Sequence, residues 1–421
     1  MRAYRESNPP EIETMSAIAD APAAFVPDDR LARRNALVLA VAQALAGANN
    51  IVLVATGGLV GAMLAPDRGL ATLPITVYVV GLWMGTLPVG MLARRFGRRA
   101  TFQIGSVFGV LTGLTCCVAV LVASFPLFNL GALFSGFYAA AHQAYRFAAA
   151  DTASEAFRPK AISWVMTGGI AAGVIGSQLV IVSKDLWLPY AFAGTYVAQA
   201  LLAVFSMGVL TFVNIPKPRA RMVGEEGRPL AEIVRQPRFV VAVACGVVSY
   251  AMMNLVMTSA PLAMVDCNHS VTDATLGLQW HVLGMFVPSF FTGWLIVRFG
   301  IERIMLLGFG LMLGAAAIAV AGIGLWNFWS ALALLGVGWN FAFVGATTLV
   351  TQCHREGERN IVQAFNDFMV FGAVALASFS SGKLLASVGW TVVNEVVMPV
   401  VLLAGALVLW SSLRARPAVQ G

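Results

Sequence analysis

The sequence has few charged residues and few cysteines. Only 11% of its 421 residues are charged, whereas 59% are hydrophobic and the mean hydropathy is +0.80. Soluble globular proteins of this length do not have that composition, so the sequence excludes that class and indicates a chain that crosses a membrane many times. The five cysteines are scattered and odd in number, which excludes a disulfide framework.

Motifs for phosphate chemistry and for catalysis are also missing. The chain has no G-x-x-x-x-G-K-[ST] sequence, which excludes a P-loop ATPase. Its apolar runs leave no soluble segment large enough for a catalytic site, so we expect a protein that is not an enzyme and has no cofactor. Residues 1–34 lack an apolar stretch, which argues against a signal peptide and predicts a cytoplasmic tail.

The dominant feature of the chain is a series of apolar runs of about 20 residues, the length that a helix needs to cross a bilayer. Twelve spans are predicted, at residues 35–60, 70–93, 100–123, 126–149, 161–183, 189–213, 237–262, 274–297, 303–323, 326–349, 361–384 and 391–413. We expect an all-α integral membrane fold with two pseudo-symmetric six-helix bundles, at 35–213 and 237–413. A cytoplasmic loop at 214–236 joins them, and a cytoplasmic tail at 414–421 follows.

Lysine and arginine outside the spans lie mostly on one predicted side of the membrane. The densest group follows the second span, at Arg94, Arg95, Arg98 and Arg99, and the central loop is also basic. By the positive-inside rule this side is cytoplasmic, and it carries both termini. The net charge of +7 therefore reflects topology in a lipid bilayer and does not indicate a nucleic-acid partner.

Two pairs of potential metal ligands stand on neighbouring spans. Met253 and Met257 lie four residues apart in the seventh span, and His281 and Met285 lie four apart in the eighth. Residues at i and i+4 share a helix face, and the expected depths of the two pairs agree within about 6 Å. Three thioethers and one imidazole suit copper, above all Cu(I). The alternative is that the methionines fill the core and His281 hydrogen-bonds inside the bundle.

The two halves carry a sequence repeat at constant spacing. Gly81, Gly90, Leu92, Arg95, Phe96 and Gly97 match Gly284, Gly293, Leu295, Arg298, Phe299 and Gly300. Parallel six-span repeats joined by a basic loop are the build of the major facilitator superfamily. Residues 90–99 resemble that family's signature loop between helices 2 and 3, except that Arg94 replaces the usual acidic residue. The resemblance implies a transporter with a substrate site near the midplane and alternating access.

Within that family the chain resembles the CcoA-like transporters. Their hallmark is a Met-x-x-x-Met in helix 7 and a His-x-x-x-Met in helix 8, which Met253, Met257, His281 and Met285 match. The resemblance implies copper import across the bacterial inner membrane through these four residues, in support of cbb3-type cytochrome oxidase assembly. It also implies a periplasmic copper donor and a cytoplasmic copper carrier as partners.

Five further residues are candidate accessory copper ligands. We expect Cys267 and His269, in the outer loop between spans 7 and 8, to collect copper before the cavity. Cys245 lies eight residues before Met253 on the same predicted helix face, and it is a candidate copper ligand further inward along the path. Cys353 and His354 are candidate ligands that transfer copper to the cytoplasmic carrier. The alternatives are plain packing for Cys245 and solvated residues without a role for the others.

Six ionisable residues are candidates for gating or coupling. His142 and Arg146 lie one turn apart near the inner end of the fourth span, and Asp367 lies inside the eleventh. Charges at membrane depth are functional candidates, so we expect one of the first two to pair with Asp367 and to carry a proton or gate the inner side. Asp151 is expected to pair with Arg98, beside Arg95. The alternatives are a structural pair and charges that only set topology.

An organic-solute porter, for riboflavin or a drug, is the competing prediction. Trp83, Tyr138, Trp280 and Trp339 are the aromatic residues expected to stack on a planar ring. A third prediction, a copper receptor that signals without transport, lacks an output domain. Loss of uptake in His281→Ala or Met253→Ala is expected for a copper importer and not for a flavin porter.

Overall fold

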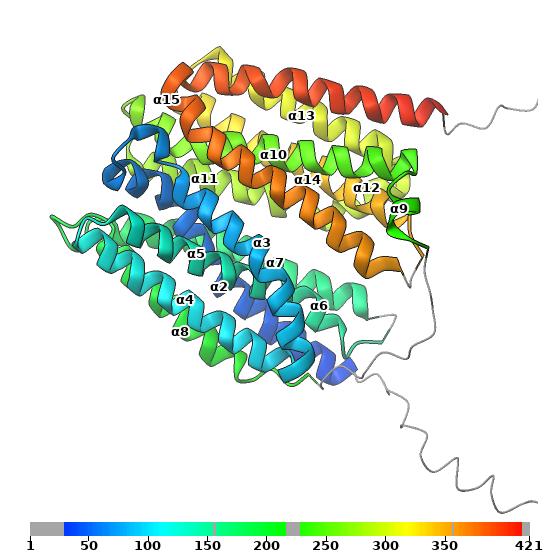
Figure 1. The fold of residues 1–421 in the computed structure, drawn as a ribbon, viewed down its shortest axis with the longest axis horizontal. Helices are drawn as coiled ribbons and strands as arrows, with labels where there is room; N and C mark the ends of the chain where they lie inside the picture. Colours follow the sequence, from blue (N-terminus) through cyan, green and yellow to red (C-terminus); the bar gives the residue numbers. More distant parts are fainter. Residues whose placement is uncertain (1–28, 155–156, 216–227, 356–357, 415–421) are drawn as a thin grey trace, which may run out of the picture.

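The computed structural model describes residues 29–154, 157–215, 228–355 and 358–414. Most of the predicted N-terminal tail, much of the central loop and most of the C-terminal tail lie outside the described residues. Where the chain is described, it consists of helices that lie roughly parallel to one long axis (Figure 1).

The N-terminal bundle has six membrane-crossing units. Its fourth unit is a broken helix, α5 (Phe125–Gln143) followed by α6 (Tyr145–Ala150). The other five are α2 (Asp29–Leu64), α3 (Leu73–Phe96), α4 (Arg98–Leu121), α7 (Arg158–Ser183) and α8 (Ala193–Leu210). The short helix η1 (Arg68–Leu70) lies between α2 and α3.

The C-terminal bundle repeats this arrangement. Its helices are α10 (Pro237–Asp266), α11 (Val271–Phe286), α12 (Ser289–Phe299), α13 (Ile301–Ala321), α14 (Leu325–Thr351) and α15 (Arg359–Arg414), with the short helix α9 (Leu230–Ile233) before them. α11 and α12 form one bent span, with an angle of 42° between them. Pro288 lies at the bend, where its missing N–H interrupts the helical hydrogen bonds.

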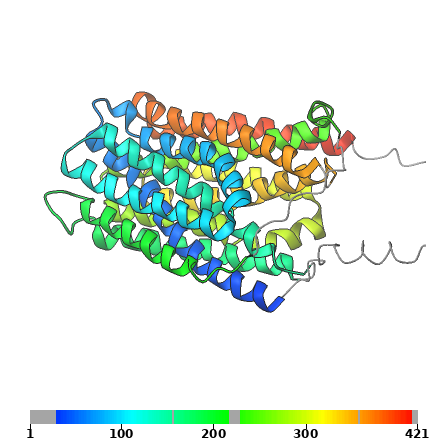
Figure 2. The same ribbon diagram turned by 60° about the horizontal axis from the view of Figure 1, so that its bottom comes forward.

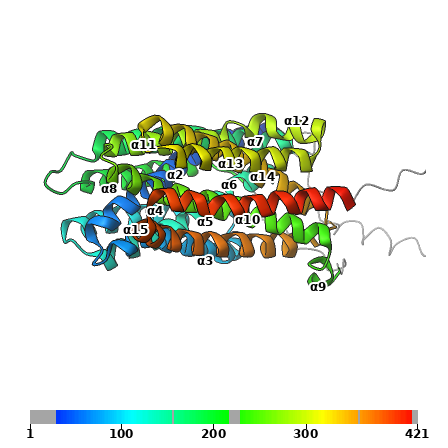
Figure 3. The same cartoon turned by 90° about the horizontal axis from the view of Figure 1, so that it is seen from above.

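The long helix α15 accounts for the last two predicted spans. It runs the length of the molecule, reverses and returns (Figures 1 and 3). The reversal lies at Gly389, whose φ of 79° is a left-handed conformation that glycine adopts without strain. The described residues thus supply twelve crossings, as predicted. The described part of the first crossing extends from Asp29, whose carboxylate accepts hydrogen bonds from the backbone N–H and the hydroxyl of Ser154.

The internal repeat is visible as matching turns and matching close contacts. Gly97 and Gly300 both have positive φ, 89° and 92°, at the equivalent turns before α4 and α13. A Cβ at Gly136 would lie 2.3 Å from the carbonyl oxygen of Tyr78, and one at Gly336 would lie 2.3 Å from that of His281. Glycine is therefore required where α5 meets α3 and where α14 meets α11, since only glycine allows backbones so close.

The start of α2, helix α9 and the end of α15 lie at one end of the molecule, here called the α9 end (Figures 1 and 2). The opposite end is called the η1 end. At the α9 end, the half-buried Arg228 guanidinium bonds the buried Glu358 carboxylate at 2.9 Å. These hydrogen bonds hold the pKa of Glu358 well below its usual range. The chain leading into α9 is thereby attached to the C-terminal bundle.

Polar contacts between the two bundles gather toward the η1 end. The Arg68 side chain donates to the Asp266 carboxylate, and the Gln178 amide donates to Gln279 at 2.9 Å. Between α3 and α15, the Thr72 hydroxyl donates to the carbonyl of Ser378 at 3.1 Å and accepts from the N–H of Gly382 at 3.1 Å. The bundles are thus closed against each other at this end.

Candidate functional site

An aromatic group lies inside the C-terminal bundle, with rings from three helices. The Tyr250 ring of α10 lies 5.2 Å from Trp339 and 5.1 Å from Phe343, both on α14, and 5.9 Å from Phe371 on α15. Trp339 and Phe343 are four residues apart and stack at 5.1 Å with an angle of 12°. We call these four residues the aromatic group. Such an assembly presents flat π surfaces of the kind that stack on a planar ligand.

Residues of α2 and α3, in the N-terminal bundle, lie near the aromatic group. The Trp83 ring of α3 lies 5.2 Å from Phe368 of α15. The Tyr78 hydroxyl of α3 accepts a hydrogen bond of 2.7 Å from the Asn50 amide of α2. The contact of Trp83 with Phe368 therefore joins the two bundles beside the aromatic group.

Two opposite charges face each other across the bundles at this level. Asp367 lies on α15 one helical turn before Phe371, and Arg146 lies on α6. The Arg146 guanidinium interacts electrostatically with the Asp367 carboxylate and with Tyr250. The two charged groups are too far apart for a direct ion pair. The pairing of a fourth-span cation with Asp367 stays a prediction, for which Arg146 is the candidate.

Several polar atoms around the aromatic group are buried without a hydrogen-bond partner. They are Nε1 of Trp339, Nε of Arg146 and Oδ1 of Asn50. Leaving such a group unpaired costs about 1–3 kcal/mol. A ligand that supplies partners to two donors and an acceptor recovers that free energy, so the region is a candidate binding site.

His142 does not join this site. Its ring lies 6.1 Å from Tyr138 and 6.3 Å from Tyr145, edge-on to both, and both ring nitrogens are buried without a hydrogen-bond partner. Tyr145 in turn packs against Phe102 of α4. His142 is therefore turned toward the tyrosines of its own bundle, in α5, and the helix breaks at Ala144 before Arg146 in α6. Its part in coupling stays a prediction.

Other predicted gating residues lie at the α9 end. The Arg98 guanidinium donates to the Asp151 carboxylate at 2.9 Å, as expected for that contact. Arg95 is exposed and lies over the ring of Phe96 at 5.3 Å. Their part in gating stays a prediction.

The four residues of the methionine and histidine motifs are all buried in the C-terminal bundle. Met253 and Met257 lie on α10, and His281 and Met285 lie on α11. The Nδ1 atom of His281 is 2.8 Å from the carbonyl oxygen of Leu332 on α14, and its Nε2 atom has no hydrogen-bond partner. The three methionines pack within the large apolar core of the protein.

The candidate accessory ligands are dispersed and separately engaged. The Sγ atom of Cys245 lies 3.9 Å from the carbonyl oxygen of Ala404 on α15. Residues eight apart on a helix do not point in the same direction, so Cys245 and Met253 face different neighbours. His269 bonds the Ile323 carbonyl, and burial together with Asp266 raises the pKa of the neighbouring Cys267 thiol. Because these candidate copper ligands do not lie together, the structure gives no support to a pathway of accessory ligands.

Residues at the exit end are equally separate. The Cys353 thiol donates to the Leu349 carbonyl at 3.3 Å, and burial raises its pKa. His354 bonds the Arg355 carbonyl at 2.9 Å. Among the described residues, no three His, Cys, Asp or Glu side chains converge as metal ligands.

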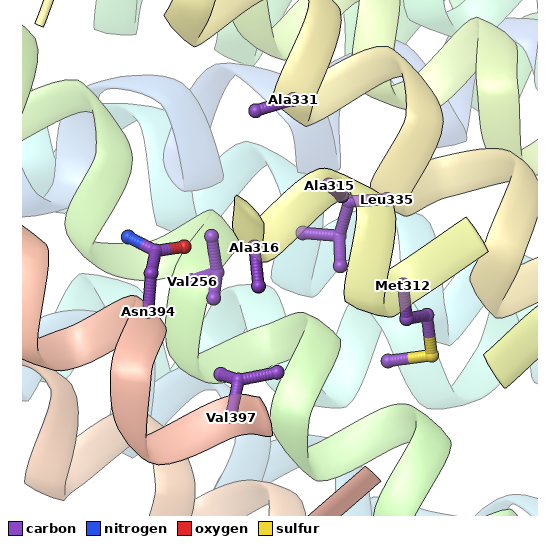
Figure 4. Close-up of a pocket in the computed structure, with 8 residues that line it drawn as sticks. All are labelled: Val256, Met312, Ala315, Ala316, Ala331, Leu335, Asn394 and Val397. Carbon is purple, nitrogen blue, oxygen red and sulfur yellow. The ribbon is translucent and has the colours of Figure 1, made fainter. Parts of the chain in front are cut away.

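One enclosed gap in the C-terminal bundle is too small for a substrate. Its volume is about 10 Å³, and its lining is apolar except for Asn394 (Figure 4). The Asn394 amide is already bonded to the Trp390 carbonyl at 2.9 Å. The gap lies between helices of a single bundle, so it is a packing defect and not the transport site.

The sequence matches the family described as Major Facilitator Superfamily over residues 36–369 and 242–420. The chain belongs to the major facilitator superfamily. It is a multi-pass membrane protein and a transporter rather than an enzyme. The solved structure of the xylose transporter XylE from E. coli, in a partially occluded inward open conformation, superposes with a TM-score of 0.69. At 15% identity over 93% of this chain and 99% of XylE, that likeness establishes the fold alone.

A curated relative bears on the substrate. The chain is 48% identical to the riboflavin transporter RfnT of Brucella anthropi, over 89% of this chain and 95% of that protein. It is 27% identical to the uncharacterized MFS-type transporter YdeG of Bacillus subtilis, over 90% of this chain and 92% of that one.

The relative named for riboflavin corrects the prediction of copper import. Copper as the substrate, the copper donor and carrier, and a role in cytochrome oxidase assembly are all overturned by this similarity. The motif of Met253, Met257, His281 and Met285 misled because flexible methionines also serve as core packing, and a buried histidine also serves as a backbone hydrogen-bonder.

Sequence reasoning found part of the aromatic site. Trp83 and Trp339 were expected at a planar ligand, and both lie at this level. Tyr138 is instead buried against α4, and Trp280 is exposed on α11. Tyr250, Phe343 and Phe371 were missed, although the i, i+4 spacing of Trp339 and Phe343 was a signal in the sequence.

Proposed function

We propose that this chain carries riboflavin across the bacterial inner membrane by alternating access. The observation that carries the proposal is the 48% identity to the riboflavin transporter RfnT over most of both chains. The site is compatible with that cargo, because the tricyclic ring of riboflavin is flat and aromatic, while its pyrimidine edge and its ribityl chain are polar. The aromatic group supplies stacking surfaces, and the unpaired polar atoms nearby supply hydrogen bonds.

In this proposal the α9 end faces the cytoplasm, as the distribution of arginine favours. The contacts at the η1 end then close the outer side, and the bundles rock about the riboflavin site. We propose that charged residues control that rocking, through Arg95 and the Arg98–Asp151 ion pair at the α9 end and through the opposite charges of Arg146 and Asp367.

The experiment is uptake of radiolabelled riboflavin by riboflavin-auxotrophic bacteria that lack their own transporter. Cells that express the wild-type chain are expected to accumulate the label, and Trp339→Ala is expected to lower initial uptake about tenfold. A lost aromatic stacking surface of about 0.5–1.5 kcal/mol accounts for a change of up to that size.

The matched control is Trp326→Ala. Trp326 lies on the same helix, α14, but is 76% exposed at the η1 end. Its replacement is expected to leave uptake within about twofold of wild type. Well-expressed wild-type protein that takes up no more riboflavin than empty cells would refute the proposed function.

A further inference from the structure

Arg146 and Asp367 are placed as two halves of a binding site that the protein does not complete by itself. They come from different bundles, Arg146 from α6 and Asp367 from α15. Toward the η1 end, the opposite charges of Arg68 and Asp266 form a direct ion pair between the bundles. Nearer the α9 end, Arg146 and Asp367 interact electrostatically but form no direct ion pair.

Both side chains have unused hydrogen-bonding capacity. The Nε atom of Arg146 is buried without a partner. The Asp367 side chain is exposed between the bundles, and its carboxylate accepts only a hydrogen bond of 3.3 Å from the neighbouring Asn366 amide. A structural ion pair would satisfy both groups directly, which is not what the geometry shows. The arrangement offers a donor on one bundle and an acceptor on the other.

A flavin has a ring edge with the complementary pattern. The pyrimidine part of its isoalloxazine ring presents a carbonyl, an N–H and a second carbonyl in a row. An arginine donates to such a carbonyl, and a carboxylate accepts from such an N–H. Hydrogen bonds of this kind, with one ionised partner, are stronger than those between neutral groups.

The aromatic group fixes where that edge lies. Phe371 is one turn beyond Asp367 on α15, and its ring lies 5.9 Å from Tyr250. A flat ring stacked beside Tyr250 therefore has its edge within reach of α15 at Asp367. Arg146 reaches the same place from the other bundle, since it interacts with both Tyr250 and Asp367.

Resting on the proposed riboflavin transport, we propose that Asp367 accepts the pyrimidine N–H of the flavin and that Arg146 donates to the adjacent carbonyl. The flavin thereby bridges the two bundles where the protein has no ion pair of its own. The bridge couples occupancy of the site to closure at the α9 end.

The test compares riboflavin with 3-methylriboflavin, in which the pyrimidine N–H is blocked. Flavin fluorescence is quenched when the ring stacks on aromatic side chains, so binding is measured on purified protein in detergent without transport. Wild-type protein is expected to bind 3-methylriboflavin at least tenfold more weakly than riboflavin. In Asp367→Ala the ratio of the two affinities is expected to fall to about twofold or less, because the carboxylate that accepts from the N–H is absent.

Glu395→Ala is the matched control, since Glu395 is an exposed carboxylate on the same helix, α15. It is expected to keep the wild-type ratio. An Asp367→Ala protein that still discriminates tenfold would overturn this inference while leaving riboflavin transport standing. Wild-type protein that binds no riboflavin would overturn the proposed function together with the inference.

Discussion

His281 illustrates how the surroundings of a single side chain decide its role. It is fully buried, and its Nδ1 atom is bonded to the backbone carbonyl of Leu332, which fixes the orientation of the ring against α14. Met253 beside it in the sequence motif is 1% exposed and packs in the core. We therefore expect these residues to stabilise the C-terminal bundle in a flavin porter.

His281→Ala and Met253→Ala are therefore expected to reduce the amount of folded protein but not the intrinsic transport rate. Because the methionine atoms that are removed are buried, Met253→Ala is expected to lower the free energy of unfolding by about 2–5 kcal/mol. Riboflavin uptake, normalised to protein extracted in folded form, is expected to stay within about twofold of wild type. A loss of more than tenfold per folded molecule would instead place the motif in the substrate site. Met253→Leu, which conserves volume, serves as the control.

Between helices, the contact of α3 with α15 depends on one glycine. A Cβ at Gly382 would lie 2.4 Å from the hydroxyl oxygen of Thr72, closer than atoms can approach. The same glycine donates its N–H to that hydroxyl, so the close approach and the hydrogen bond are two aspects of one contact. Closure at the η1 end thus depends on a small residue at this crossing.

Gly382→Ala is expected to separate α3 from α15 and to lower riboflavin uptake severalfold. Gly372→Ala on the same helix is the control, because no atom lies within 4 Å of a Cβ there. Thr72→Ala removes the atoms nearest the new methyl group, so the double variant is expected to recover part of the uptake. If Gly382→Ala transports like Gly372→Ala, the crossing does not control closure.

For the molecule as a whole, alternating access requires that contacts at the η1 end break as easily as they form. The Arg68–Asp266 pair is largely exposed, and exposed ion pairs contribute only about 0–1 kcal/mol. The amide contact of Gln178 with Gln279 is exposed as well. Weak polar contacts let the two closed states have similar free energies, whereas a large apolar contact would trap one of them.

Reversal of one charge in the Arg68–Asp266 pair is expected to disturb that balance. Arg68→Asp places two carboxylates together and is expected to lower riboflavin uptake about threefold to fivefold at low ionic strength, with less effect in salt. The exchanged pair, Arg68→Asp with Asp266→Arg, is expected to restore uptake. An exchanged pair that stays as impaired as Arg68→Asp would show that the contact acts through something other than charge.

The sequence alone predicted that the chain is a membrane protein, that it crosses the membrane twelve times and that its two bundles are a duplication. These features depend on local properties: runs of apolar residues long enough for a bilayer, and glycines such as Gly97 and Gly300 that allow equivalent turns. The start of the first span at residue 35 stays a prediction, since α2 already includes Asp29, the first described residue.

The binding site was determined only by the tertiary structure. The break at Ala144 between α5 and α6 gives Arg146 an electrostatic interaction with Asp367, while His142, one turn earlier, packs against tyrosines of its own bundle. Packing of α10 against α14 and α15 brings Tyr250 to Trp339 and Phe371. Hydrophobic patterning identifies which segments enter the membrane, but nearly every face of such a helix is apolar, so the pattern does not specify which faces meet.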